Sequence, residues 1–264
     1  MNTRILDAHV HLPSGRIPDA QFCGFAEMES AVAYAREAGV SGMVFNFWDA
    51  LHARTSAELD AGNERALTVY ERNRSFFYPG VAIDAGCPEC SVRWIREFAR
   101  RGLRWCGEVL PKGRLDYTAP EWLKLFEVCE ENRLIVQLHM SPSVATLARR
   151  LSGLTIVHSH IDVATLPALA ECPNVFLDFS GFSGLRLGGL ETSLKALGPD
   201  RILFGSDFTV YSPAFFLDRL QEAVADERER EMILSGNLLH LLERAGGRQP
   251  FQEGQDHVGD ESDG

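Results

Sequence analysis

The chain has 264 residues, of which 45% are hydrophobic and 24% are charged. This composition excludes collagen-like, intrinsically disordered and disulfide-scaffold proteins. Its 37 Asp and Glu against 26 Lys and Arg give a formal charge of -11. A nucleic-acid partner is therefore not expected, because such binding depends on Lys and Arg that neutralise phosphates.

Neither a membrane span nor an export signal is predicted. No segment reaches the eighteen or so consecutive apolar residues that a span requires, and the opening residues MNTRILDAHVHLP lack an apolar stretch of the signal-peptide type. We therefore expect a cytoplasmic protein with reduced thiols. Cys87 and Cys90 form a single CxxC without a second pair, so no structural zinc site is predicted there. The sequence leaves a homo-oligomer open.

Short, almost continuously apolar runs predict strands that are buried on both faces of a parallel sheet. In chain order these are Arg4–Ala8, Gly42–Phe47, Phe76–Ile83, Leu103–Val109, Leu134–Leu138, Leu154–Val157, Val175–Phe179 and Arg201–Phe204. Stretches with helical periodicity lie between them: Glu27–Ala38, Glu58–Arg72, Cys90–Arg101, Pro120–Asn132 and Ser143–Leu151.

Eight strands alternating with helices predict an α/β fold, a single (β/α)8 TIM barrel of parallel strands spanning residues 1–245. The alternative is a doubly wound open sheet, which usually has a glycine-rich phosphate loop after its first strand. Here the first strand ends in His-Val-His. From Gly246 the chain becomes polar, acidic and glycine-rich, so residues 246–264 are predicted to be a disordered acidic tail.

Side chains that can bind metals follow several of the predicted strands. They are His9 and His11 on strand one, Glu108 on strand four, His139 on strand five, His158 and His160 on strand six, and Asp207 after strand eight. The carboxyl ends of barrel strands converge on one face, where the active site is built. Imidazole and carboxylate together suit zinc and its first-row neighbours. We therefore expect a catalytic divalent metal site, most simply zinc, at this face.

The same residues resemble a known family. The run Asp7-Ala8-His9-Val10-His11, the strand-end His139 and His160, and Phe204-Gly205-Ser206-Asp207-Phe208 are similar to the amidohydrolase superfamily. Within it the chain resembles the amidohydrolase-related group that includes aminocarboxymuconate semialdehyde decarboxylase. The run Ser235–Leu242 is similar to that group's closing helix, with Leu238 and His240 in place of its usual Ala and Arg.

The resemblance implies specific roles for the site residues. His9, His11, His139 and Asp207 would bind the metal, and His160 would ligate it or orient the reacting group. His158 is expected to pack inside the barrel. Gly107-Glu108 matches the Gly-Glu of the TatD-like branch, which makes Glu108 a bridging ligand between two ions. The alternative is a carboxylate that holds a ligating histidine in its tautomer. One or two ions per chain are therefore expected.

A metal-activated water predicts a hydrolase that acts on a small ester, lactone or amide. Asp207 would serve as general base and His160 would stabilise the oxyanion or protonate the leaving group. The alternative is a metal-dependent, non-oxidative decarboxylase of an aromatic or dienoic acid. Candidate substrate-binding residues lie in the strand-to-helix loops: Trp48, His52, Lys112, Arg114, Arg186 and Phe208, with Tyr211 beside them. Lys112 and Arg114 would suit an anionic substrate.

Overall fold

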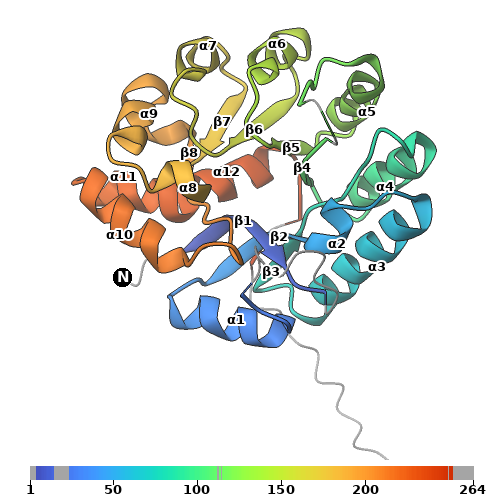
Figure 1. Cartoon of the computed structure of the whole chain (residues 1–264), viewed down its shortest axis with the longest axis horizontal. Helices are drawn as coiled ribbons and strands as arrows, with labels where there is room; N and C mark the ends of the chain where they lie inside the picture. Colours follow the sequence, from blue (N-terminus) through green and yellow to red (C-terminus); the bar gives the residue numbers. More distant parts are fainter. Residues whose placement is uncertain (1–3, 15–23, 112, 114, 249, 252–264) are drawn as a thin grey trace, which may run out of the picture.

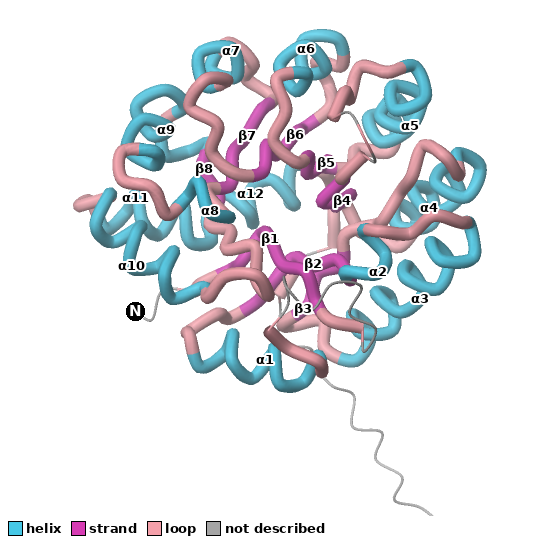
Figure 2. The backbone as a smooth tube through the Cα atoms, in the orientation of Figure 1, coloured by secondary structure: helices cyan, strands magenta, loops and turns pink. Residues whose placement is uncertain are grey.

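Eight parallel strands form the centre of the molecule, and helices surround them (Figures 1 and 2). The computed structural model describes residues 4–14, 24–111, 113, 115–248, 250 and 251. The strands are β1 Leu6–Leu12, β2 Gly42–Phe47, β3 Phe77–Pro79, β4 Trp105–Val109, β5 Ile135–Leu138, β6 Thr155–Ser159, β7 Val175–Asp178 and β8 Ile202–Leu203. The α/β barrel predicted from the sequence is confirmed.

Helices follow the strands in the order that a barrel requires. They are α1 Met28–Glu37, α2 Trp48–Leu51, α3 Ser56–Arg72, α4 Pro88–Arg100, α5 Pro120–Glu131, α6 Ser143–Arg150, α7 Leu166–Ala170, α8 Gly181–Gly184, α9 Gly189–Leu197, α10 Pro213–Ala223, α11 Glu227–Glu231 and α12 Asn237–Arg244, with short turns η1 Pro199–Arg201 and η2 Met232–Gly236. The residue types at the N-termini of several helices explain where those helices begin. Thr55 and Glu58 form a capping box at α3, and proline opens α4 and α5. Within the described part of the chain, no helix is long and apolar enough to cross a membrane.

Backbone hydrogen bonds close the ring at two seams between a three-stranded sheet, β1-β2-β3, and a five-stranded sheet, β4 to β8. At one seam, Val81 N–H donates to the Trp105 carbonyl and Gly107 N–H to the Val81 carbonyl, each at 2.9 Å. At the other, residues 204–208 continue β8 alongside β1, and Asp207 N–H donates to the His9 carbonyl at 2.9 Å. The same seam carries a parallel bridge between Val10 and Phe208. In the described part of the chain, these contacts join the two sheets into a closed ring.

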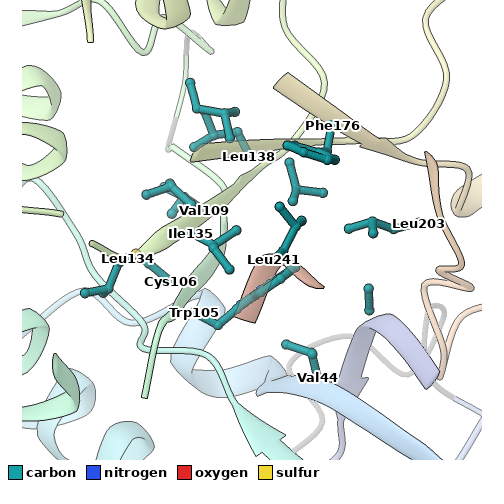
Figure 3. Packing of buried hydrophobic residues seen from close by; sticks show 14 of the residues in the cluster. Val44, Trp105, Cys106, Val109, Leu134, Ile135, Leu138, Phe176, Leu203 and Leu241 are labelled. Atoms are coloured by element: carbon teal, nitrogen blue, oxygen red, sulfur yellow. The ribbon is translucent and has the colours of Figure 1, made fainter. Parts of the chain in front are cut away.

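The barrel has two ends with different contents. We use "mouth" for the end where the strands terminate and "base" for the end where they begin. The base is covered by the C-terminal segment: α12 crosses behind the ring of strands in Figure 1. Figure 3 shows Leu241 of α12 in the same group of buried apolar side chains as Trp105 and Val44.

Residues beyond α12 continue this cover. Arg248 N–H donates to the Gly102 carbonyl at 2.9 Å, and the Phe251 carbonyl accepts from Arg4 Nη2 at 2.7 Å. The Phe251 ring is 3% exposed and lies so close to Gly42, the first residue of β2, that a Cβ there would fall 2.6 Å from it. Within the polar segment predicted to be disordered, this part is therefore packed, and residues 252–264 lie outside the described residues.

The strand boundaries differ from the predicted ones where backbone pairing, rather than apolar content, sets the ends. β1 runs on to Leu12, so His9 and His11 lie inside the strand. β3 is only Phe77–Pro79, and β8 only Ile202–Leu203, because the residues after them pair irregularly across the seams. The single-turn helices α2 and α8 carry too few residues to show a helical period.

Candidate metal and active site

Two histidines of β1 face the same point at the mouth. His9 and His11 are two residues apart on a strand, so their side chains leave the same face. Both are almost fully buried, and their Nε2 atoms lie 3.1 Å apart. The rings meet edge to face, with centroids 5.0 Å apart. Two imidazole nitrogens so close together form one half of a candidate coordination site.

Two carboxylates from other parts of the barrel complete this cluster. Glu108 of β4 places Oε2 at 3.4 Å from His11 Nε2 and 3.6 Å from His9 Nε2. Asp207, which follows β8, places Oδ1 at 3.6 Å from His11 Nε2 and 3.7 Å from His9 Nε2. Residues nearly 200 positions apart thus meet at one point because β1 and β8 are neighbours in the closed barrel.

His139 and His160 approach the other carboxylate oxygen of Glu108, and the His160 ring stacks on His9 with centroids 5.1 Å apart. His139 Nδ1 lies 3.0 Å from Glu108 Oε1, and His160 Nε2 lies 3.7 Å from the same oxygen. Their ring centroids are 4.8 Å apart. All six residues predicted as metal ligands are therefore gathered around one carboxylate or its immediate neighbours, and their role as ligands stays a prediction.

The backbone at two of these residues is unusual. His160 and Asp207 have φ angles of 65° and 60°, in the left-handed region that side chains other than glycine seldom adopt. Gly181 lies beneath His160, where a Cβ would fall 2.6 Å from the His160 Nδ1 atom. Such backbone conformations occur where surrounding structure fixes a functional side chain. The backbone at the mouth therefore fixes the direction of the His160 and Asp207 side chains.

A polar network behind His9 fixes which of its nitrogens faces the cluster. Asp178, at the end of β7, accepts from His9 Nδ1 at 3.2 Å and is itself held by Gln137 Nε2 at 2.9 Å. The Ser180 hydroxyl contacts His9 Nδ1 at 3.0 Å and His160 Nδ1 at 2.9 Å, and it donates to Asp178. With Nδ1 so engaged, Nε2 is the His9 nitrogen that faces the cluster.

Sequence reasoning missed Asp178, Ser180 and Gln137. A signal was present for the first: Asp178 is an acidic residue that ends an apolar strand, VFLD, like the strand-end residues that were identified. Ser180 and Gln137 give no such signal, because serine and glutamine are common in loops and strands of every function. Only the tertiary contacts reveal them.

The charges of the cluster depend on one another. Burial alone would lower the pKa of His9, but the Asp178 and Glu108 carboxylates outweigh it and raise that pKa well above its usual value. Burial would raise the pKa of Glu108, yet His9, His11 and His139 hold it well below its usual value. Glu108 is therefore an anion at neutral pH, held by three imidazoles.

Asp207 and His160 shift towards their neutral forms. Burial raises the pKa of Asp207 to about 7. The positive charge of His9 opposes this rise, and the negative charge of Glu108 adds to it. Burial also lowers the pKa of His160 to about 4. A neutral imidazole keeps a lone pair free for a metal ion or a proton.

This donor set fits a divalent metal ion. The Nε2 atoms of His9 and His11 face each other at 3.1 Å, and two carboxylates flank them. A divalent cation can bind imidazole nitrogens and carboxylate oxygens together. Among the residues that the structure describes, two groups of three have ligand atoms within 4.8 Å of one another: His9, Glu108 and His160, and His9, His11 and Asp207. Both groups use His9.

Of the other predicted residues, Trp48 and His52 lie beside this cluster. Trp48 packs over His11, with ring centroids 4.8 Å apart, and stacks on His52 at 5.8 Å. Phe208 is buried against Tyr34 and Phe25. Lys112 and Arg114 lie outside the described residues.

Arg186, Tyr211 and His158 occupy separate surroundings. Arg186 lies over Phe182, 5.0 Å from its ring centroid, and lines a groove of about 470 Å³ that none of the six ligand-type residues borders. Tyr211 packs against Phe216. His158 is fully buried and its Nδ1 lies 3.1 Å from the His160 carbonyl, so it contacts the backbone beside the cluster.

Comparison with known proteins assigns the chain to a family. The amidohydrolase family model matches residues 6–243. By sequence, no curated protein matches the chain. Many solved structures share the fold, and three of them illustrate the range of enzymes found among them.

One is a 2,6-dihydroxybenzoate decarboxylase complexed with 2,6-dihydroxybenzoate, with a TM-score of 0.71, 15% identity, and coverage of 92% of this chain and 100% of that one. Another is a dihydroxybenzoic acid decarboxylase from Polaromonas sp. with bound manganese and the inhibitor 2-nitroresorcinol, with a TM-score of 0.70, 17% identity, and coverage of 91% and 97%. A third is a Pseudomonas putida protein named for 2-pyrone-4,6-dicarboxylic acid hydrolase activity, with a TM-score of 0.67, 19% identity, and coverage of 92% and 98%.

Proposed function

The chain belongs to the amidohydrolase family of metal-dependent enzymes, and from this premise we propose that it is a hydrolase acting on a small ester, lactone or amide. The observation that carries the proposal is the convergence of His9, His11, Glu108 and Asp207: the two Nε2 atoms lie 3.1 Å apart, and each carboxylate has an oxygen within 3.7 Å of both. We propose zinc as the resident ion, because imidazole and carboxylate donors suit it, and the manganese in the Polaromonas structure makes manganese the alternative.

His9 has one nitrogen available to a metal ion, and this limits how a second ion could be bound. Its Nδ1 atom is engaged by Asp178, so its Nε2 atom can serve only one ion. A first ion would use His9, His11 and Asp207. A second ion would depend on Glu108 together with His139 and His160, whose nitrogens approach Glu108 Oε1 at 3.0 and 3.7 Å. Metal analysis of protein purified without chelators tests this: two ions that fall to one in Glu108→Gln support a bridge, and one ion unaffected by that substitution supports a positioning role.

When bound, a divalent ion acidifies a coordinated water and polarises the substrate carbonyl. The chain's own residues then move the protons. Asp207, 15% exposed at its side chain, is the carboxylate open to the mouth and accepts the proton of the attacking water. His160 stabilises the developing oxyanion or protonates the leaving group, and Ser180 holds its Nδ1 atom at 2.9 Å.

Substrate selection is assigned to the rim of the mouth. Trp48 and His52 form a stacked pair over His11, and they would contact a flat substrate there. Lys112 and Arg114 remain candidates for binding an anionic group. We expect a small-molecule substrate and a cytoplasmic site of action.

A second candidate function is non-oxidative decarboxylation. It is favoured by the two structural neighbours that are named as decarboxylases, one with 2,6-dihydroxybenzoate bound. The same metal-ligand cluster would serve it, since a metal ion can also bind a substrate carboxylate or phenolate.

One assay separates the two functions. The purified enzyme is incubated with a panel of lactones and esters and, in parallel, with aromatic and dienoic acids, while acid release and carbon dioxide release are measured. Acid release that disappears in Asp207→Asn supports the hydrolase. Carbon dioxide release alone contradicts it and establishes the lyase.

A further inference from the structure

We propose that Ser180 is a positioning residue that fixes the ring proton of His160 on Nδ1, so that the His160 Nε2 atom faces the metal-ligand cluster without a proton. The inference rests on the proposed function, because it concerns how His160 enters the reaction of that site. It goes further by assigning the proton to one ring nitrogen and by naming the hydroxyl group that decides this.

Ser180 stands where a serine usually has a different task. It is the N-cap residue of α8, and an N-cap serine usually accepts a hydrogen bond from a backbone N–H of the first helical turn. The Ser180 side chain makes no such bond, and the residue is fully buried. Its hydroxyl contacts Asp178, His9 and His160 instead. The hydroxyl therefore belongs to the polar network behind the metal-ligand cluster and not to the helix.

The hydroxyl proton of Ser180 goes to Asp178. Asp178 Oδ1 already accepts from the backbone N–H groups of His160 at 3.4 Å and of Ser180 at 3.2 Å. Asp178 Oδ2 accepts from Gln137 Nε2 at 2.9 Å. These three groups can only donate, so both oxygens of the carboxylate act as acceptors. The Ser180 hydroxyl therefore donates its single proton to Asp178.

A hydroxyl that has donated its one proton can only accept from its other neighbours. His160 Nδ1 lies 2.9 Å from Ser180 Oγ, and His9 Nδ1 lies 3.0 Å from it. Each of these two nitrogens must carry a proton to make its hydrogen bond. In a neutral imidazole with a proton on Nδ1, the Nε2 atom keeps a lone pair. The hydroxyl therefore selects this tautomer in His160.

The two histidines depend on Ser180 to different degrees. His9 Nδ1 also lies 3.2 Å from Asp178 Oδ2, so its proton keeps a carboxylate partner without the hydroxyl. Among the residues that the structure describes, Ser180 is the one hydrogen-bond partner of His160 Nδ1. The His160 ring itself is held by its stacking on His9 and by its edge-to-face contact with His139. Ser180 thus decides where the proton of His160 lies, and packing decides where the ring lies.

The other nitrogen of His160 faces a carboxylate. His160 Nε2 lies 3.7 Å from Glu108 Oε1, which is too far for a hydrogen bond. A proton on Nε2 would point at this oxygen and occupy the space between the two groups. With the proton held on Nδ1, the same space is open to a cation that both groups can bind. His160 can then donate a proton to a leaving group only after Nε2 has received one.

The test uses the full chain, freed of metal ions with a chelator and labelled in its histidines with a heavy nitrogen isotope. NMR spectra of the ring nitrogens at neutral pH distinguish a proton on Nδ1 from one on Nε2, and the His160 signals are assigned by their loss in His160→Gln. We expect the proton on Nδ1 in the unsubstituted chain. In Ser180→Ala we expect it on Nε2, because Glu108 is then the nearest acceptor.

Matched variants separate this role from a general loss of structure. Ser159→Ala removes a buried hydroxyl that has no hydrogen-bond partner among the described residues, so the His160 tautomer should not change. Ser180→Thr keeps the hydroxyl and should keep the proton on Nδ1. If Ser180→Ala does not fold, Ser180→Cys replaces it. Because a thiol is a weak hydrogen-bond acceptor, we then expect a mixture of the two tautomers.

Two results would overturn the proposal. One is a His160 proton on Nε2 in the metal-free, unsubstituted chain. The other is a proton that stays on Nδ1 in a folded Ser180→Ala protein. Neither result bears on the proposed hydrolysis, because the spectra are recorded without metal or substrate. A chain that hydrolyses none of the lactones and esters would, in turn, leave the assignment of the His160 proton intact.

Discussion

The mouth of this barrel buries ionisable side chains, whereas the base buries apolar ones. At the mouth, buried histidines and carboxylates face one another at 3.0–3.7 Å, and two of them stand on left-handed backbone. At the base, aromatic and aliphatic groups such as Phe251 and Leu241 lie under the strands. Burying an ionisable group destabilises the fold unless a partner or a metal ion compensates, whereas burying an apolar group stabilises the fold. The mouth is therefore organised for chemistry and the base for stability.

The largest expected effect separates the two ends directly. His9→Ala removes the nitrogen shared by both candidate metal-binding groups, so we expect turnover to fall about 1,000-fold or more, equivalent to about 4 kcal/mol of transition-state stabilisation. The melting temperature of the metal-free protein should also fall, because the buried Asp178 and Glu108 carboxylates lose a partner, so turnover is compared per folded molecule. Activity and bound metal, measured with calorimetry on the same samples, check this. Normal metal content and turnover in His9→Ala, His139→Ala and Asp207→Asn together would refute the metal-ligand cluster.

The base should respond in the reverse way. Phe251→Ala opens a cavity against β2 and β3, so we expect a loss of about 3 kcal/mol in the free energy of unfolding. The turnover number of the folded fraction should stay the same. Urea unfolding and kinetics at low temperature measure both quantities.

A matched pair of truncations sharpens that result. A chain that ends after Phe251 should keep its stability within about 0.5 kcal/mol, and one that ends after Arg248 should resemble Phe251→Ala. Equal stability of the two truncated chains would show that Phe251 does not stabilise the base.

The network behind His9 offers an intermediate effect. Asp178→Asn keeps the shape of the side chain but removes the charge that orients His9, so we expect a loss of about 10–100-fold in metal affinity or activity. Asp218→Asn, on the exposed side of α10, is the control and should change neither. Metal titration of both variants, in parallel, gives the comparison. An Asp178→Asn protein with unchanged affinity would mean that Ser180 alone holds the tautomer.

The smallest effect lies at the rim of the base. Arg100 and then Arg101 lower the pKa of Glu97 from 4.5 to about 2. A carboxylate whose pKa is lowered by folding stabilises the fold above pH 4.5, and this contribution disappears as the pH falls through about 2. Because the side chains are partly exposed, Glu97→Gln should cost about 1 kcal/mol or less at pH 7 and nothing near pH 2. Unfolding curves at the two pH values test the sign.

The fold could be predicted from the sequence because apolar runs and helical periodicity reflect local burial. The histidines and Asp207 could also be assigned to the mouth, since each ends or follows a strand and parallel strands end together. His9 and His11 show the limit, because β1 continues past them by pairing with β2 on one side and with residues 204–208 on the other, which no local pattern reveals. Ser180, Gln137 and Phe251 were missed for the same reason. Their importance lies in contacts with residues far away in the chain, and their types alone carry no such information.

Closure of the ring by residues 204–208 and of its underside by Phe251 has a consequence for biosynthesis. On the ribosome, β1 is made first, yet one of its two neighbours emerges only after most of the polypeptide has been translated. Until then its outer edge is an unpaired template for strand addition, which favours aggregation. A cell that makes this protein therefore benefits from chaperones that shield the nascent amino-terminal strands during elongation.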